Sequence, residues 1–410
     1  MTSLSRRGMS GWRVGGFAAL AAAACVLAAC SSSGGSGSPA SSAPPPVGSS
    51  AAAPAPNGSA SGSTGSGVEA AKQIVAEAEK PAVWRGPTES VDLSKVKGKS
   101  VYEISLTQQI PALAQWMTVT QQQLEAAGMK ATICDAKGTP AGIIQCFQQG
   151  IAQRPAVILA QALDTTFIHK YIAQANAAGI KVVTSQTGVP GIPTTTGAVA
   201  EATVSYPQVG KLLAAYFAAQ SNCTGYPQII TSTSSRQPSA ALVGAMQKEI
   251  SSLCPQVKAT SVQNVLIPDQ PTKLPTLTRS LLTQNSNLQY MVPIYDGMTI
   301  YMAPAIRSLG NKNVQMFSFN ATPVVMQTLL NKSALTADVG SPNQWFGYAQ
   351  ADQVLRAAAG AAPVADENLP LRLFTADNIG SIDPKADEST WYGSVDFACN
   401  YHKLWGLPCS

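Results

Sequence analysis

The alternation of strand-like and helix-like segments after residue 100 constrains the fold of this chain most. A β-rich run at residues 100–106 precedes an amphipathic helical stretch at residues 112–127, and this pair recurs along the chain. The signature Ala-Ala-Gly ends a predicted helix before the strand-like runs at residues 129–133 and 180–184. Strands that alternate with helices of about 10–15 residues form right-handed βαβ units with parallel sheets. Continuous apolar runs such as AVILA fit sheets covered on both faces.

Length and composition narrow the architecture further. A chain of 410 residues is too long for one ordinary domain, and 45% apolar residues suffice for a globular core. The net charge is +5, but Lys and Arg form no block, so we expect no nucleic-acid partner. The sequence therefore predicts an α/β protein with two consecutive doubly wound parallel-sheet lobes.

The N-terminal residues have the pattern of a targeting segment. Arg6, Arg7 and Arg13 precede an uncharged, Ala-rich stretch, which is the layout of a secretory signal over residues 1–29 and is too short for a confident membrane span. The sequence Leu-Ala-Ala-Cys ending at Cys30 resembles the lipobox of bacterial lipoproteins, in which the cysteine carries the lipid. The alternative is an ordinary secreted protein in which Cys30 happens to follow the apolar stretch.

The residues after this cysteine are composed as a tether. Residues 31–67 contain no charged residue and consist almost only of Ser, Gly, Ala and Pro. Such a segment buries too little apolar surface to offset its ordering entropy. We therefore expect a lipidated, flexible tether over residues 30–67, a lead segment over 68–98, and a folded part that is extracytoplasmic and held at the outer face of the cell membrane by the lipid anchor only.

Six cysteines remain after the signal segment and the anchor, and they indicate disulfides. They fall into three near pairs, and joining neighbours is the simplest of several connectivities. None has the spacing of metal ligands, so we expect neither a metal nor a cofactor. The predicted pairs are Cys134 with Cys146, Cys223 with Cys254, and Cys399 with Cys409.

From Lys99 to Asn378 the chain resembles a known family, the ribose-type (type I) periplasmic binding proteins, in their lipid-anchored actinobacterial form. The segments that carry the resemblance are Pro111 after SLTQQI, DAKGTPAGIIQ, GIKVVTSQ, YDGMTIYMAPAIRSLG, FSFNATP and TADVGSPNQWFG. The resemblance implies two lobes joined by a three-segment hinge, with a ligand cleft at the C-terminal ends of the strands. The boundaries we predict are 99–205 plus 342–375 for the N-terminal lobe, and 206–341 plus 376–410 for the C-terminal lobe with a disulfide-stapled extension.

The resemblance also points to ligand-binding positions. Gln186 and Asn320 stand where the family has ligand-binding aspartates, and these neutral residues argue against ribose itself. Sugars and polyols need hydrogen-bonding partners for their hydroxyls and an aromatic face for their C–H surface. Trp116 also fits an apolar core stripe, Asp296 a helix cap, and Arg236 a solvated loop. The predicted ligand-binding set is Gln109, Trp116, Gln186, Tyr206, Arg236, Tyr295, Asp296, Asn320 and Trp345.

No catalytic constellation stands out. The sequence has no Gly-x-Ser-x-Gly elbow and no His-Glu-x-x-His, and it has only two histidines, so we expect no enzyme and no catalytic residue. The resemblance implies a monomeric binding protein that captures a sugar or polyol by hinge closure and delivers it to an ABC-transporter permease. Two alternatives share the fold: a sensory receptor, and a binding protein for an amino acid, nucleoside or signal molecule.

Overall fold

The computed structural model describes residues 61–192, 196–257, 260–310 and 313–409. The predicted signal peptide, Cys30 and the predicted tether up to residue 60 lie outside this part of the chain. The last residues of the predicted tether are helical, because α1 (Ser61–Ala78) begins before Val68. Gly67 lies so close to the Leu253 carbonyl that a Cβ there would be 2.0 Å from its oxygen, so this glycine serves helix packing.

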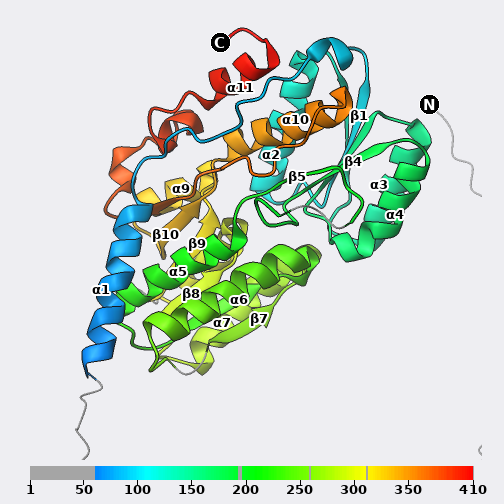
Figure 1. Ribbon diagram of the computed structural model, residues 1–410. Helices are drawn as coiled ribbons and strands as arrows, with labels where there is room; N and C mark the ends of the chain where they lie inside the picture. The colour runs from blue at the N-terminus through cyan, green and yellow to red at the C-terminus, as the bar shows by residue number, and fades with distance from the viewer. Residues whose placement is uncertain (1–60, 193–195, 258–259, 311–312, 410) are drawn as a thin grey trace, which may run out of the picture. The chain divides into compact units, whose positions relative to one another are not determined.

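The first lobe is built on five parallel strands in the order β2-β1-β3-β4-β5 (Figure 1). Successive strand residues point to opposite faces, so Val101 packs in one apolar cluster with α2 and α10, while Tyr102 packs in the other with α3 and α4. The elements are β1 (Ser100–Ser105), α2 (Pro111–Ala126), β2 (Lys130–Asp135), α3 (Pro140–Gln153), β3 (Val157–Gln161), α4 (Thr165–Ala177), β4 (Lys181–Ser185), β5 (Ala200–Ala202) and α10 (Asn343–Ala359).

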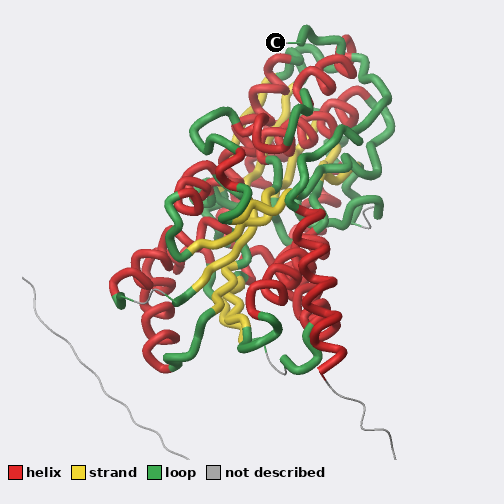
Figure 2. Tube along the Cα trace, turned by 90° about the vertical axis from the view of Figure 1, so that its left-hand side faces the viewer, coloured by secondary structure: helices red, strands yellow, loops and turns green. Residues whose placement is uncertain are grey.

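The second lobe is built on a sheet of order β11-β10-β9-β8-β6-β7. Helices α5 and α6 pack together over one face and α1 packs on α5, while α7 contacts α8 and α9 contacts β10. Figure 2 shows the strands flanked by helices. The elements are α5 (Tyr206–Ser221), β6 (Pro227–Thr231), α6 (Arg236–Leu253), β7 (Ser261–Asn264), α7 (Gln270–Gln284), β8 (Tyr290–Pro293), α8 (Thr299–Ser308), β9 (Gln315–Asn320), α9 (Pro323–Leu330), β10 (Leu335–Gly340) and β11 (Arg372–Thr375).

These two sheets confirm the predicted α/β fold, and the predicted three crossings connect β5 to α5, β10 to α10, and α10 to β11. One boundary needs correction. The predicted N-terminal lobe includes residues 342–375, but β11 pairs antiparallel with β10 of the second sheet, with Gly340 opposite Arg372. The pairing covers the backbone edge that β10 would otherwise expose.

The C-terminal extension also differs from its predicted place in the C-terminal lobe. Helix α11 (Phe397–Trp405) packs on α10 of the first lobe, where Phe397 stacks on Trp345 with ring centroids 5.3 Å apart. Trp84, from the segment before β1, stacks on Trp345 at the same centroid distance. Aromatic contacts with residues far apart in the sequence thus hold this extension on the first lobe. No local sequence pattern predicts such contacts.

The three disulfides join the pairs that the sequence predicts. Cys134–Cys146 links β2 to α3, Cys223–Cys254 links the ends of α5 and α6, and Cys399–Cys409 links α11 to the residues that follow it. Short 3-10 helices occupy Leu93–Lys95, Thr233–Ser235, Ile267–Asp269, Asp296–Met298, Ile379–Ser381 and Glu388–Tyr392.

Candidate ligand-binding site

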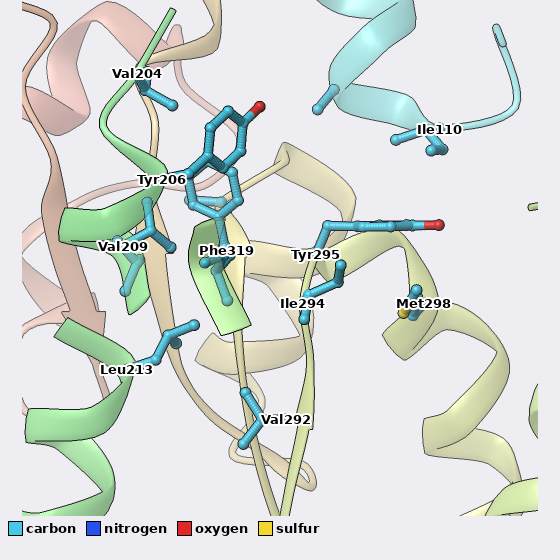
Figure 3. Close-up of a cluster of buried hydrophobic side chains, with 14 of the residues drawn as sticks. Ile110, Val204, Tyr206, Val209, Leu213, Val292, Ile294, Tyr295, Met298 and Phe319 are labelled. Carbon is cyan, nitrogen blue, oxygen red and sulfur yellow. The ribbon is translucent and has the colours of Figure 1, made fainter. Parts of the chain in front are cut away.

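A cavity of about 50 Å³ lies between the two lobes, where strands of both sheets end. Helix α2 contributes from the first lobe, and α6, β8 and β9 contribute from the second. Figure 3 shows Ile110 of the first lobe opposite Tyr206, Tyr295 and Phe319. The side chains around the cavity are Ile110, Leu113, Trp116, Ala162, Tyr206, Ser235, Pro238, Ser239, Leu242, Ile294, Tyr295, Phe319 and Asn320.

The backbone is unusual where the strands reach this cavity. Ala162 after β3, Gln186 after β4, and Asn320 at the end of β9 have φ values of 57°, 63° and 121°. Ala321 follows with φ 55°. Residues other than glycine pay a conformational cost in this left-handed region, and such residues gather at functional sites. Four residues with this left-handed backbone lie at three strand ends, which indicates a functional site at this edge of the two sheets.

Two buried carboxyl groups hold the loop that carries Asn320. Asp296 accepts hydrogen bonds from the backbone N–H and the hydroxyl of Thr322, both at 2.6 Å, and Asp338 accepts one from the Ala321 N–H at 3.1 Å. Burial raises the pKa of Asp296 to about 6. Burial, followed by the charge of Asp296, also raises the pKa of Asp338. Asp296 therefore positions the loop behind Asn320.

A second series of hydrogen bonds, made by residues of the crossover between β10 and α10, holds the Trp116 side chain in place. The Trp116 indole N–H donates to Asn343 Oδ1 at 2.8 Å, and Asn343 Nδ2 donates to the Asn320 carbonyl at 3.1 Å. Glu388 accepts from the Asn343 backbone N–H and, at 2.7 Å, from Gln115 Nε2. Burial raises the pKa of Glu388 to about 8. Asn343 thus ties an aromatic wall of the first lobe to the Asn320 loop of the second.

The tyrosines at the cavity have partners of their own. The Tyr206 hydroxyl donates to Gln186 Oε1, and the Tyr295 hydroxyl accepts from Gln270 Nε2. Gln186 Nε2 and Asn320 Oδ1 are buried and have no hydrogen-bond partner within the described chain. Buried polar atoms are normally satisfied, so these two atoms are candidates for ligand contact.

The two lobes also touch each other beside the cavity. The Thr165 N–H of α4 donates to Gln237 Oε1 of α6 at 3.1 Å, and Gln237 Nε2 donates to the Thr165 hydroxyl at 2.6 Å. The Thr165–Gln237 contact therefore joins the two lobes next to the cavity. The cavity, at about 50 Å³, is smaller than the roughly 300–1,000 Å³ of typical ligand pockets.

Four of the predicted ligand-binding side chains line the cavity. Trp116, Tyr206, Tyr295 and Asn320 all contribute to its wall. Gln186 lies one layer behind, bonded to the Tyr206 hydroxyl.

Four other predicted residues lie outside the wall. Asp296 supports the Asn320 loop, as described above. Gln109 is exposed, and its backbone N–H bonds the Thr107 hydroxyl. Arg236 is exposed at the first residue of α6. Trp345 lies in the apolar cluster on the α2–α10 side of the first sheet. Gln109, Arg236 and Trp345 therefore do not line this cavity, and contact between them and a ligand stays a prediction.

Several lining residues had no sequence signal that singled them out. Leu113 and Leu242 lie on amphipathic helices, where an apolar residue reads as ordinary core. Phe319 directly precedes Asn320 in FSFN, and its place next to a predicted ligand-binding residue is the one signal that could have pointed to it.

Charged groups are absent from the cavity wall: within the described chain, no Asp, Glu, Lys, Arg or His side chain lines it. The same part of the chain holds no group of three or more side chains placed to bind a metal ion. None of its helices is both long and apolar enough to cross a bilayer.

Comparison with known proteins agrees with this geometry. The family described as a periplasmic binding protein domain matches residues 107–362. The chain belongs to this family of solute-binding proteins, which confirms the predicted resemblance to periplasmic binding proteins; the lipid-anchored actinobacterial form stays a prediction. Membership implies an extracytoplasmic location. No curated protein matches the sequence.

Solved structures with the same fold include three ABC-transporter solute-binding proteins. One from Agrobacterium vitis with bound allitol is 18% identical, with a TM-score of 0.62 over 70% of this chain and 98% of its own. One from Bacillus halodurans with bound myo-inositol is 16% identical, with a TM-score of 0.62 over 70% and 97%. One from Mycobacterium smegmatis with bound glycerol is 18% identical, with a TM-score of 0.60 over 69% and 96%.

Proposed function

We propose that this chain is an extracytoplasmic solute-binding lipoprotein, not an enzyme, that captures a sugar or polyol between its lobes as a monomer and delivers it to an ABC-transporter permease. The observation that carries the proposal is the cavity at the strand ends of both sheets, lined from both lobes in a chain of this family. Open α/β sheets bind ligands at these ends of their strands. The sugars and polyols bound to the structural neighbours support the ligand class.

Capture follows from the hinge. A ligand that enters between separated lobes contacts Trp116 on one side and Tyr295 and Asn320 on the other, so its binding free energy favours the closed arrangement. The contact between Thr165 and Gln237 forms only when the lobes meet, and it adds to the closed state. Lipid attachment at Cys30, which the lipobox-like sequence supports, holds the protein beside the membrane where a permease resides.

A thermal-shift screen of sugars, polyols, amino acids and nucleosides tests the proposal. A ligand at about 100 times its dissociation constant adds roughly 2.7 kcal/mol to the unfolding free energy, which raises the melting temperature visibly. Asn320→Ala removes a buried hydrogen-bonding group and weakens binding by about tenfold or more. Asn287→Ala, at an exposed position, is the matched control and leaves binding unchanged. A shift produced only by amino acids or nucleosides contradicts the proposed ligand class.

A further inference from the structure

We propose that the ligand of this cavity is an uncharged sugar or polyol with a continuous C–H face, of the deoxy or O-alkyl class, and that fully hydroxylated and ionised sugars bind more weakly. This inference rests on the proposed function, because it narrows the ligand class of the same site. Three properties of the cavity wall carry it: its charge, its polar groups and its aromatic rings.

The first property is the absence of any balancing charge. None of the described side chains that line the cavity is an Asp, Glu, Lys, Arg or His, so none carries a charge near neutral pH. The exposed Arg236 lies outside the wall, and so does Asp296, whose Oδ2 accepts hydrogen bonds from Thr322 while its Oδ1 is buried without a partner within the described chain. An ionised group buried without a partner is strongly disfavoured. A sugar acid, a sugar phosphate or a zwitterionic amino acid therefore finds no counter-charge when the lobes close.

The second property is the small number of hydrogen-bonding groups. The polar side chains of the wall are Ser235, Ser239 and Asn320, with the hydroxyls of Tyr206 and Tyr295, which already bond Gln186 and Gln270. The Ser239 hydroxyl already donates to the Ser232 carbonyl at 2.7 Å. These groups are few and most already have partners, so each further hydroxyl that is buried without a partner lowers affinity. Asn320 Oδ1, which lacks a partner, suits one ligand hydroxyl as donor.

The third property is the apolar and aromatic surface on both sides. Leu113 and Trp116 face the cavity from the first lobe, and Leu242, Tyr295 and Phe319 face it from the second. Aromatic and aliphatic walls of this kind bury C–H surface well and leave hydroxyls unsatisfied. A sugar in which a hydroxyl is replaced by hydrogen or by a methyl ether therefore fits this wall better than the sugar with the free hydroxyl.

Calorimetric titration of the purified protein with matched sugars tests this inference. The pairs are L-rhamnose with L-mannose, and L-fucose with L-galactose, in which only one hydroxyl differs; D-galactose with D-galacturonate tests charge. We expect the deoxy member of at least one pair to bind about tenfold or more tightly, and the acid not to bind. Equal or tighter binding of the hydroxylated or acidic member overturns the inference and leaves the proposed function standing. Binding of no sugar or polyol overturns both.

Variants of the wall connect the preference to its residues. Leu242→Gln and Leu113→Gln each add an amide to one side of the cavity, so the preference for the deoxy sugar falls by about fivefold. Leu309→Gln, at a side chain that is 44% exposed, is the matched control and keeps the preference. Two variants on different lobes keep the test informative when one of them fails to fold. An unchanged preference in a folded wall variant contradicts the assignment.

Discussion

Replacing Glu388 by glutamine should remove a pH-dependent loss of stability. Glu388 is 3% exposed and accepts hydrogen bonds from the Asn343 backbone N–H and the Gln115 side chain at the crossover between the lobes. Burial raises its pKa from the ordinary value of 4.5 to about 8. Glutamine has nearly the same shape, still accepts from Asn343, and donates to Gln115 once that amide rotates.

The sign of the effect follows from the raised pKa. Below about pH 4.5 the carboxyl group is protonated in both states, and its contribution to stability is fully present. As the pH rises toward about 8, the unfolded chain ionises while the folded chain keeps its proton, so stability is lost. At about 1.4 kcal/mol per pH unit, the total loss is of the order of 5 kcal/mol, of which roughly 3 kcal/mol falls between about pH 5.5 and 8.5.

Urea unfolding of both proteins at these two pH values measures the difference. We expect Glu388→Gln to gain roughly 3 kcal/mol on the wild type as the pH rises from about 5.5 to 8.5. Glu69→Gln, with a side chain that is 67% exposed, controls for loss of a carboxylate and shows no such gain. A constant difference between Glu388→Gln and the wild type across this range would refute the assignment of a buried, protonated carboxyl group.

Two other changes test the packing. Glu103 in β1 is fully buried, and neither of its carboxylate oxygens has a hydrogen-bond partner within the described chain. Glu103→Gln should therefore raise the melting temperature at pH 8, because it removes an unpaired buried acid. A lower melting temperature in the variant contradicts this assignment. Trp84 contacts Trp345 and Tyr401, so Trp84→Ala should cost about 1–3 kcal/mol in urea unfolding, whereas Val83→Ala, at a 60% exposed side chain, stays within about 0.5 kcal/mol. Equal losses in these two variants contradict the docking of this segment.

The features of the fold that the sequence predicted are local ones. Apolar periodicity and the Ala-Ala-Gly helix ends depend on nearby residues, so the strands and helices of both lobes were predictable. The antiparallel β11 and the docking of α11 depend on partners far away in sequence. Arg372 of β11 donates to the Glu79 carbonyl, and Trp405 of α11 donates to Asp352, and neither pair leaves a local pattern.

The candidate site was predictable in its polar and aromatic members and not in its apolar ones. The sequence points to Asn320 because the segment around it resembles a family whose ligand positions are known, and to Tyr206 because it is an aromatic residue on a predicted strand-end loop. Leu242 could not be found, because a leucine on an amphipathic helix looks the same whether it faces a core or a cavity. Trp345 packs against Phe397 of the distant C-terminal extension instead of lining the cavity, and no local pattern predicts that partner.

A crystal structure of the protein with the tightest-binding sugar or polyol is the most direct test of the account. We predict that the ligand lies between Trp116 of the first lobe and Tyr295 and Phe319 of the second, with one hydroxyl bonded to the Asn320 side chain. A ligand bound outside this cavity, or one whose ionised group sits unpaired among these rings, would contradict it.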